Sequence, residues 1–260
     1  VTGSTDSTGN LTLPGAPAGT QAYTITVSKS GYYGATTYPP YPTSAFNPVD
    51  IHGSVVAGVL NQKTMVMDQS SDITFTTKDP FGTAIPSIDY AIEGGRIIGA
   101  EPVTSANVFA FDESGTTDAS GEASYPGESS GQYVVSVTAP DHQFYKLLPE
   151  SALANQFTST AGVASDVTAV LLDETIGSVL VKVENSADSS VLAGASVQLS
   201  NTTLSYDVTV TTDQYGYAYF PTSLPELVDE NYGIDVTLSG YADESATVSV
   251  SGALVNQTMQ

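Results

Sequence analysis

A turn motif that occurs three times is the feature of this sequence that most constrains its fold. Thr-Asp-x-x-Gly occupies residues 5–9, 117–121 and 212–216, and alternating polar and apolar residues follow each copy. Asp at the second position and Gly at the fifth suit a tight turn, because the carboxylate accepts backbone N–H groups and glycine adopts a positive φ. Copies about one small domain apart predict a tandem array of similar units.

Matching strand patterns follow the turns. Residues 23–27, 133–137 and 232–238 alternate apolar with small polar side chains, which is typical of half-buried strands. A further set of matching stretches lies near the end of each unit, at residues 59–65, 165–170 and 254–259. The chain is therefore predicted to be all-β, built from repeated sandwiches.

The two longer units also share a beginning. An alternating strand is predicted at residues 72–77 and at 178–183, and a second strand at 84–88 and 192–197. These starts place unit boundaries near residues 69 and 176. We predict an incomplete β-sandwich repeat holding only the second half of the pattern at 1–68, and complete sandwiches at 69–175 and 176–260. Period-two burial predicts these core residues: Ile73, Phe75, Ile88, Val135, Val137, Val179, Val181, Val197, Ile234, Val236 and Leu238.

Composition excludes several classes of function. The 260 residues include 6 Lys+Arg and 28 Asp+Glu, for a net charge of −22. Nucleic acid and anionic membranes are excluded as partners, because their recognition needs clustered bases. No apolar run is long enough for membrane insertion. With no cysteine, thiolate metal sites and redox motifs are excluded. The opening residues, VTGSTDSTGN, read like the interior of a domain, so we expect a piece of a longer protein.

Four short motifs carry a family resemblance: Gly177–Lys182, Leu192–Ala195, Thr212–Gly216 and Gly240-Tyr241. The repeat resembles carboxypeptidase-regulatory-like and transthyretin-like modules and the related B-type repeats of Gram-positive collagen adhesins. The resemblance implies Ig-like or transthyretin-like antiparallel Greek-key β-sandwiches, used as stalks, spacers and adhesin units on cell surfaces. It also implies an isopeptide bond between Lys182 and Asn256, although the acid to promote it is missing: Asp235 is expected to face water.

Acidic residues suggest only a weak metal site. Asp112, Glu113 and Asp118 can converge in one hairpin, so they are the best calcium candidates. The alternative is that each Asp of the repeated motif, Asp118 included, caps its own turn and that the acidic pairs are solvated charge. We expect no cofactor.

The segment from residue 32 to residue 42, here called the Tyr/Pro loop, has the most unusual local composition. Tyr33, Tyr38 and Tyr41, held by prolines, suit contacts to glycan or protein. The alternative is that the loop folds back and caps the incomplete first repeat. Three sequons for N-glycosylation occur, at Asn10, Asn201 and Asn256.

Nothing in the sequence indicates catalysis. His52 and His142 lie in different repeats, and no Gly-x-Ser-x-Gly motif occurs. We therefore predict a non-enzymatic, extracellular, cell-surface structural protein: a modular stalk or filament-forming subunit of a pilus-like appendage, an adhesin or a surface layer. The alternatives are a glycan- or protein-binding adhesive module that uses the Tyr/Pro loop, and an accessory region of a secreted hydrolase.

The incomplete first repeat predicts a partner. A sandwich without its first strands exposes backbone donors and acceptors beside apolar surface, so a strand from elsewhere is expected to fill the gap. The donor is chain upstream of Val1, a second copy of the chain acting by strand complementation, or a rearranged Tyr38–Pro42 loop.

Overall fold

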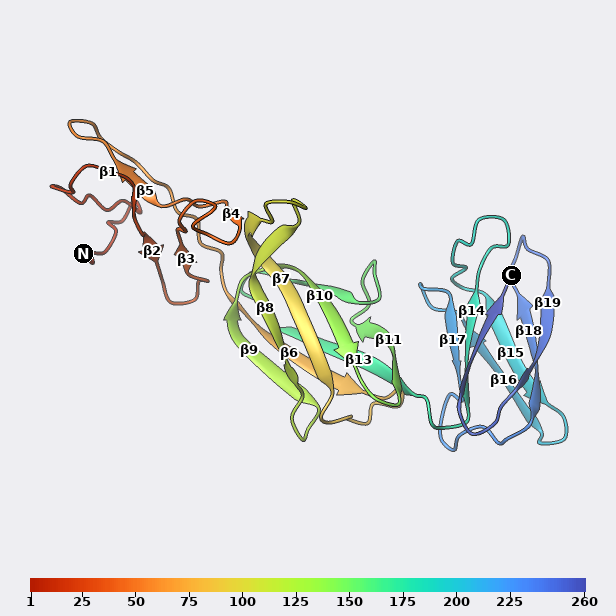
Figure 1. Cartoon of the computed structure of the whole chain (residues 1–260). Coiled ribbons are helices and arrows are strands. Elements are labelled where there is room, and N and C mark those ends of the chain that lie inside the picture. The colour runs from red at the N-terminus through yellow and green to blue at the C-terminus, as the bar shows by residue number, and fades with distance from the viewer.

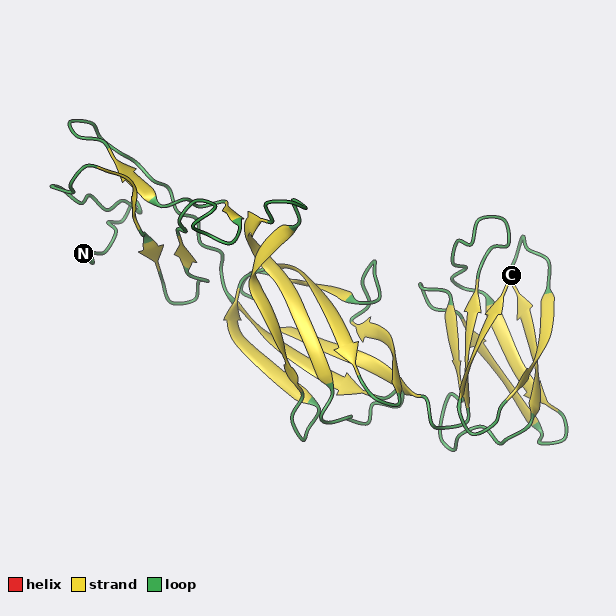
Figure 2. Ribbon diagram, viewed as in Figure 1, coloured by secondary structure: helices red, strands yellow, loops and turns green.

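A computed structural model describes all 260 residues and shows an all-β protein (Figures 1 and 2). The chain forms twenty strands, β1 to β20, and no helix, which confirms the predicted all-β fold class. The structure holds no helix that could cross a bilayer. Two sandwiches lie beside one another, and a looser N-terminal segment, residues 1–68, extends from the first of them (Figure 1).

The central sandwich supplies four strands to each of two sheets that pack face to face, and β4 (Asn47–Pro48) of the N-terminal segment adds a fifth strand to one of them. One sheet has the order β12-β10-β7-β8, and the other the order β11-β13-β6-β9. Its strands are β6 (Ser71–Lys78), β7 (Asp89–Ala100), β8 (Asn107–Thr116), β9 (Glu122–Glu128), β10 (Gly131–Thr138), β11 (His142–Leu148), β12 (Gln156–Ser159) and β13 (Ser165–Asp173).

The C-terminal sandwich has the same topology without an equivalent of β11. Its sheets have the orders β16-β15-β18-β19 and β17-β14-β20. Its strands are β14 (Ser178–Val183), β15 (Ser196–Asn201), β16 (Tyr206–Thr211), β17 (Tyr217–Phe220), β18 (Asn231–Thr237), β19 (Glu244–Ser249) and β20 (Leu254–Met259).

In both sandwiches the first and last strands are parallel neighbours, while the other pairs are antiparallel. Ile73 of β6 lies opposite Ser165 of β13, and Val179 of β14 lies opposite Val255 of β20. Because parallel strands point the same way, the chain enters each sandwich at one end and leaves it at the other. The sequence pattern does not reveal this pairing, since parallel and antiparallel neighbours show the same alternation.

The predicted cores are confirmed. Nine of the eleven predicted side chains are buried, and Val137 and Leu238 are partly buried against the two cores. In the central core the Tyr133 and Phe157 rings stack, with centroids 5.1 Å apart.

The second strand of each sandwich begins later than predicted. β7 begins at Asp89 and β15 at Ser196, so residues 84–88 and 192–195 lie outside strands. Ser87 and Gly194 take positive φ values of 60° and 79°, which break an extended chain just before each strand.

The N-terminal segment forms short strands and no core of its own. β1 (Gly19–Tyr23) pairs with β5 (Gly53–Val55), and β2 (Thr26–Val27) pairs with β3 (Ala35–Thr36). β4 (Asn47–Pro48) instead joins the central sandwich, where it pairs with the end of β7.

The burial of this segment is correspondingly low. Only Ala35, Thr37 and Ser44 are buried among residues 1–68. The stretch at residues 59–65, whose counterparts at 165–170 and 254–259 lie in β13 and β20, forms no strand, and the predicted strand at 23–27 is broken between β1 and β2. A strand needs a neighbour for its backbone groups, and residues 59–65 find none here.

We predict that Ile234→Ala destabilises the C-terminal sandwich by about 2–5 kcal/mol, because Ile234 is fully buried and its truncation leaves a cavity. Thr237→Ala, on the exposed face of the same strand, is the control and is expected to change stability by less than about 0.5 kcal/mol. Urea denaturation measures both, and equal losses would contradict the assigned register.

Candidate functional site

The three Thr-Asp-x-x-Gly motifs fold into one and the same turn. In each, the Asp Oδ1 atom accepts hydrogen bonds from the backbone N–H groups two and four residues later. The distances are 2.9 and 3.0 Å at Asp6, 2.8 and 2.9 Å at Asp118, and 3.0 and 3.1 Å at Asp213. The interpretation of these residues as turn caps is therefore the one that the geometry supports.

A fourth turn of this kind was not predicted. The Oδ1 atom of Asp79 accepts from the N–H groups of Phe81 and Thr83, at 2.9 and 2.7 Å. Its sequence, Asp-Pro-Phe-Gly, lacks the threonine by which the other copies were recognised. A search for Asp-x-x-Gly alone finds it.

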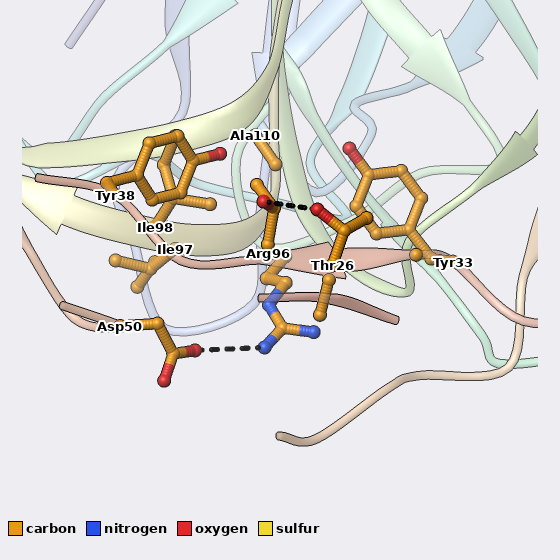
Figure 3. A pocket seen from close by; sticks show the side chains of 11 residues that line it. Thr26, Tyr33, Tyr38, Asp50, Arg96, Ile97, Ile98 and Ala110 are labelled. Carbon is orange, nitrogen blue, oxygen red and sulfur yellow. Dashed lines mark hydrogen bonds and ion pairs between the residues drawn. The ribbon is translucent and has the colours of Figure 1, made fainter. Parts of the chain in front are cut away.

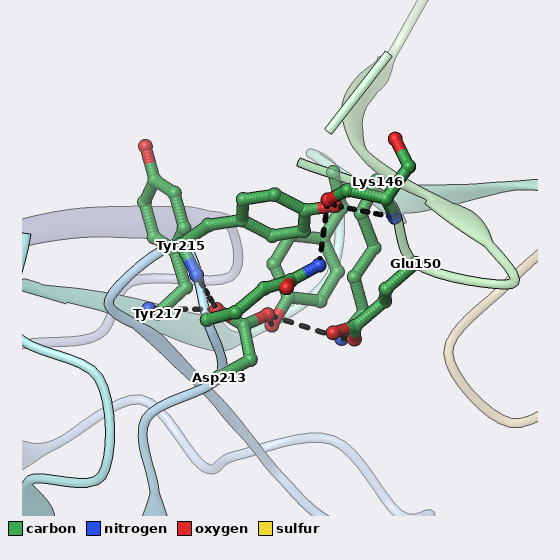
Figure 4. A network of polar contacts seen from close by, with 8 residues as sticks. Lys146, Glu150, Asp213, Tyr215 and Tyr217 are labelled. Atoms are coloured by element: carbon green, nitrogen blue, oxygen red, sulfur yellow. Dashed lines mark hydrogen bonds and ion pairs between the residues drawn. The ribbon is translucent and has the colours of Figure 1, made fainter. Parts of the chain in front are cut away.

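Asp213 differs from the other turn residues because its second oxygen reaches the neighbouring sandwich. Asp213 Oδ2 accepts from the Tyr145 hydroxyl at 2.7 Å and from Lys146 Nζ at 3.0 Å, both on β11 (Figure 4). Lys146 also pairs with Glu150. The Lys146 and Asp213 side chains are only 15% and 13% exposed, so water screens this ion pair less than it screens a surface pair.

Two further hydrogen bonds lie beside this ion pair. The Tyr215 hydroxyl and the Gln214 side-chain amide both donate to the carbonyl oxygen of Ser151, at 2.7 and 2.8 Å. Two successive side chains of this turn, Gln214 and Tyr215, thus bind the backbone of the central sandwich just after β11.

Apolar side chains complete the contact. Leu172 of β13 packs with Leu180 of β14 and Tyr219 of β17, and all three are buried; Phe81 and Leu254 lie against them. Leu180 belongs to the outer face of its sheet, which in an isolated sandwich would face water. We call this contact, together with the polar groups around Asp213, the junction.

The junction shifts the titration of two of its members. Burial raises the pKa of Tyr145, and its hydrogen bond to Asp213 raises it further. Burial alone would lower the pKa of Lys146, but hydrogen bonds to Glu150 and Asp213 outweigh it and raise the pKa overall. At neutral pH the junction therefore holds a neutral phenol and a charged ammonium group.

A cavity of about 260 Å³ lies between the N-terminal segment and the sheet edge formed by β7 and β8 (Figure 3). Arg96, the only arginine of the chain, contributes to its wall. Arg96 Nη1 donates to the carbonyl oxygen of Val66 at 2.6 Å, and the guanidinium pairs with Asp50 at 3.6 Å and Asp68 at 3.8 Å. The same residue therefore ties the N-terminal segment to β7.

The Tyr/Pro loop supplies two of the rings around this cavity. Tyr33 and Tyr38 line it, and in the view of Figure 3 Arg96 lies between them. Tyr38 also packs edge-on against Phe46, with centroids 5.2 Å apart. Tyr41 is outside the cavity and 53% exposed. The loop thus lies against the central sandwich. A loop that only capped the first repeat would not need this contact.

The calcium candidates are not assembled into a site. The structure contains no group of three acidic or histidine side chains able to hold a metal ion. Asp112 and Glu113 are adjacent on β8, so they point to opposite faces, and the Asp118 carboxylate is engaged in its own turn. The three side chains therefore do not converge in the hairpin.

The residues expected to form an isopeptide bond lie on adjacent strands but out of register. Lys182 is opposite Thr258, while Asn256 is opposite Leu180. Lys182 Nζ pairs with Glu184, and the Asn256 amide donates to Gln143 of the central sandwich at 3.0 Å. Both side chains have other partners in this structure.

The three sequon asparagines differ in their surroundings. Asn10 and Asn256 are exposed, whereas Asn201 is half-buried and its amide donates to the carbonyl oxygen of Asn231 at 2.9 Å. Glycan attachment at any of them stays a prediction.

No protein-family model matches the chain, and no curated protein matches it. Solved structures similar to it include a minor pilin of Streptococcus agalactiae, with 14% identity, 73% of this chain and 94% of the pilin covered, and a TM-score of 0.28. A streptococcal ancillary pilin has 11% identity, 90% and 73% coverage and a TM-score of 0.31. The shaft pilin of Lactobacillus rhamnosus GG has 12% identity, 73% and 97% coverage and a TM-score of 0.27. Likeness at TM-scores this low does not establish a function for this chain.

We predict that Asp118→Ala and Asp213→Ala have different costs, although both remove the same two turn hydrogen bonds. Asp118→Ala should cost its sandwich about 1–3 kcal/mol, since it removes two bonds that contribute about 0.5–1.5 kcal/mol each. Asp213→Ala should cost about 1–3 kcal/mol more, because it also leaves Lys146 and Tyr145 without their shared partner. Urea denaturation gives both values, with Asp6→Ala as a control that affects neither sandwich; equal losses would show that the Asp213 junction contact adds nothing.

We predict that the junction weakens at alkaline pH. In the closed junction, Tyr145 and Lys146 have pKa values above the ordinary 10.0 and 10.5. As the pH rises, the open junction therefore loses these two protons before the closed junction does. Their contribution is fully present below about pH 10 and is lost above it. The measurement is the difference in Tm between the wild type and a Tyr145→Phe/Lys146→Met variant: it should stay constant from pH 7 to about 9 and shrink above about 10. A difference that stays constant to about pH 12 would contradict this assignment.

Proposed function

We propose that this chain is a non-enzymatic structural part of an extracellular cell-surface protein, in which successive β-sandwiches form a stalk or a filament subunit. The observation that carries the proposal is the junction. If the two sandwiches did not contact each other, the side chains of Leu180 and Tyr219 would be exposed to solvent. In this structure they are only 2% and 8% exposed. A buried contact between successive sandwiches suits a stalk or filament that must stay rigid along its length.

The path of the chain supports the same role. Since the first and last strands of each sandwich are parallel neighbours, the chain passes from one end of a sandwich to the other before it continues. The link between β13 and β14 is only residues 174–177, which leaves little freedom between the sandwiches. Each repeat therefore adds its own length to the stalk, and the short link limits bending between neighbouring sandwiches.

Surface charge fits a protein exposed to solvent in many copies. With a net charge of −22, neighbouring chains repel one another, which keeps an array of similar sandwiches from clumping through non-specific contacts. Few basic residues are available to neutralise that charge.

We propose further that residues 69–175 and 176–260 are separate folding units and that residues 1–68 belong to an incomplete one. Support for the last point comes from exposed apolar residues in the N-terminal segment, among them Val59 at 61% and Leu60 at 79%. Completion of this segment by an outside strand remains our prediction, and the donor is either chain upstream of Val1, which the repeat alignment favours, or a second copy of the chain. No observation favours the accessory region of a secreted hydrolase.

The proposal requires the two sandwiches to keep a fixed relative position in solution. Because the chain has no cysteine, spin labels can be attached cleanly to Ser136→Cys on the central sandwich and Thr209→Cys on the C-terminal one, both exposed positions. Pulsed electron paramagnetic resonance on the full chain should give one narrow distance distribution. Tyr145→Phe/Lys146→Met should broaden it severalfold.

A matched control is the label pair in a chain carrying Thr168→Ala, a substitution in the central sandwich outside the junction. Its distribution should remain as narrow as the wild type. A broad distribution in the unsubstituted chain, with both sandwiches folded, would show that the sandwiches move independently and would sink the rigid-stalk proposal.

A further inference from the structure

We propose that the cavity between the Tyr/Pro loop and the β7–β8 edge binds one neutral sugar residue of a glycan. This inference is independent of the structural role proposed above. Small-molecule sites commonly enclose about 300–1,000 Å³, so a cavity of about 260 Å³ suits a ligand of one ring.

Arg96 supplies hydrogen-bond donors that the protein leaves largely unused. A guanidinium group has five N–H donors, and the only hydrogen bond from this one goes to the Val66 carbonyl oxygen. Its ion pairs with Asp50 and Asp68, at 3.6 and 3.8 Å, are too long to be hydrogen bonds. The side chain is only 16% exposed and lines the cavity, so ligand hydroxyl groups there can accept from the remaining donors.

Acceptors and hydroxyl groups lie around the same space. Asp50 lines the cavity, and its carboxylate can accept from ligand hydroxyls. Thr26 and Thr36 share one hydrogen bond of 3.0 Å, and Figure 3 shows no hydrogen bond from the Tyr33 or Tyr38 hydroxyl to another residue lining the cavity. Burial raises the pKa of Tyr33, so its phenol stays a neutral donor at physiological pH.

The remaining wall is apolar, as the carbon-bound hydrogens of a sugar ring require. Ile97, Ile98 and Ala110 come from β7 and β8, and Ala35 comes from β3. The aromatic rings of Tyr33 and Tyr38 add faces on which a sugar ring can pack while its hydroxyl groups remain paired. Donors, an acceptor and apolar surface in one small space match a polyhydroxylated ring better than they match a purely apolar or a purely ionic ligand.

Charge decides between a neutral and an acidic sugar. Around the cavity, Arg96 and Lys63 are balanced by Asp50 and Asp68, and Lys63 already pairs with Asp50 at 2.9 Å. There is no surplus of positive charge to hold a carboxylate, and the chain as a whole carries −22. The site is therefore assigned to a neutral residue.

A purely structural role for Arg96 accounts for part of this arrangement. Its contacts to Val66, Asp50 and Asp68 anchor the N-terminal segment on β7, and that anchoring needs no cavity. It does not account for a space beside the guanidinium that two tyrosines, two threonines and a carboxylate line together.

The test is an NMR titration of the isotopically labelled full chain with the methyl glycosides of glucose, galactose, mannose and N-acetylglucosamine, and with glucuronate as the acidic probe. At least one neutral glycoside should cause saturable shifts at the amides of Thr26, Tyr38 and Arg96, with a dissociation constant on the order of millimolar. Glucuronate should bind at least about tenfold more weakly, or not at all.

Two variants locate the binding. Asp50→Asn keeps the shape of the side chain and removes its charge, and Tyr38→Ala removes one ring; each should weaken binding about tenfold or more. Tyr41→Ala, in the same loop but outside the cavity, is the matched control and should bind as the wild type does. If one of the two variants disturbs the N-terminal segment in the NMR spectrum, the other one decides.

Three results would overturn the proposal. One is the absence of saturable shifts at the cavity with all four neutral glycosides. Another is unchanged affinity in Asp50→Asn. The last is tighter binding of glucuronate than of every neutral glycoside, which would make the cavity an anion site centred on Arg96.

Discussion

The carboxylate of Asp213 is the interaction on which the arrangement of the two sandwiches depends, because its two oxygens serve two different units. One oxygen closes the turn between β16 and β17, and the other accepts from Tyr145 and Lys146 of the central sandwich. In the folded structure, the turn that the first oxygen closes also holds the second oxygen toward the central sandwich. Local folding of the C-terminal sandwich and its attachment to the central one are therefore coupled through a single side chain.

Polar and apolar parts of the junction have different tasks. The buried cluster around Leu172, Leu180 and Tyr219 stabilises the contact in proportion to the apolar area removed from water, but it does not define one orientation. Hydrogen bonds do, because they are directional and because Tyr145 and Lys146 both donate to the same carboxylate oxygen of Asp213. The apolar cluster therefore supplies attraction that does not depend on direction, and the polar groups fix the relative position.

Period-two alternation was sufficient to predict the all-β fold and the buried faces of strands such as β6 and β18, since burial on one face is encoded residue by residue. The cap at Asp213 was predictable for the same reason: its partners lie within four residues. Its contact to Tyr145 was not, because the two residues are 68 positions apart and Asp6, with the same motif, makes no such contact. Only part of the cavity could be predicted from the sequence. The unusual composition of the Tyr/Pro loop singled out its tyrosines, whereas Arg96 is an isolated basic residue in no recognisable motif.

The parallel pairing of the first and last strands has a mechanical consequence. A pull on the two ends of the chain would draw β6 and β13, or β14 and β20, in opposite directions along their length. Hydrogen bonds between parallel strands are evenly spaced, so such a load falls on all of them together and not on one at a time. The strand pair resists shear as a unit, whereas a hairpin pulled open from its end would separate bond by bond.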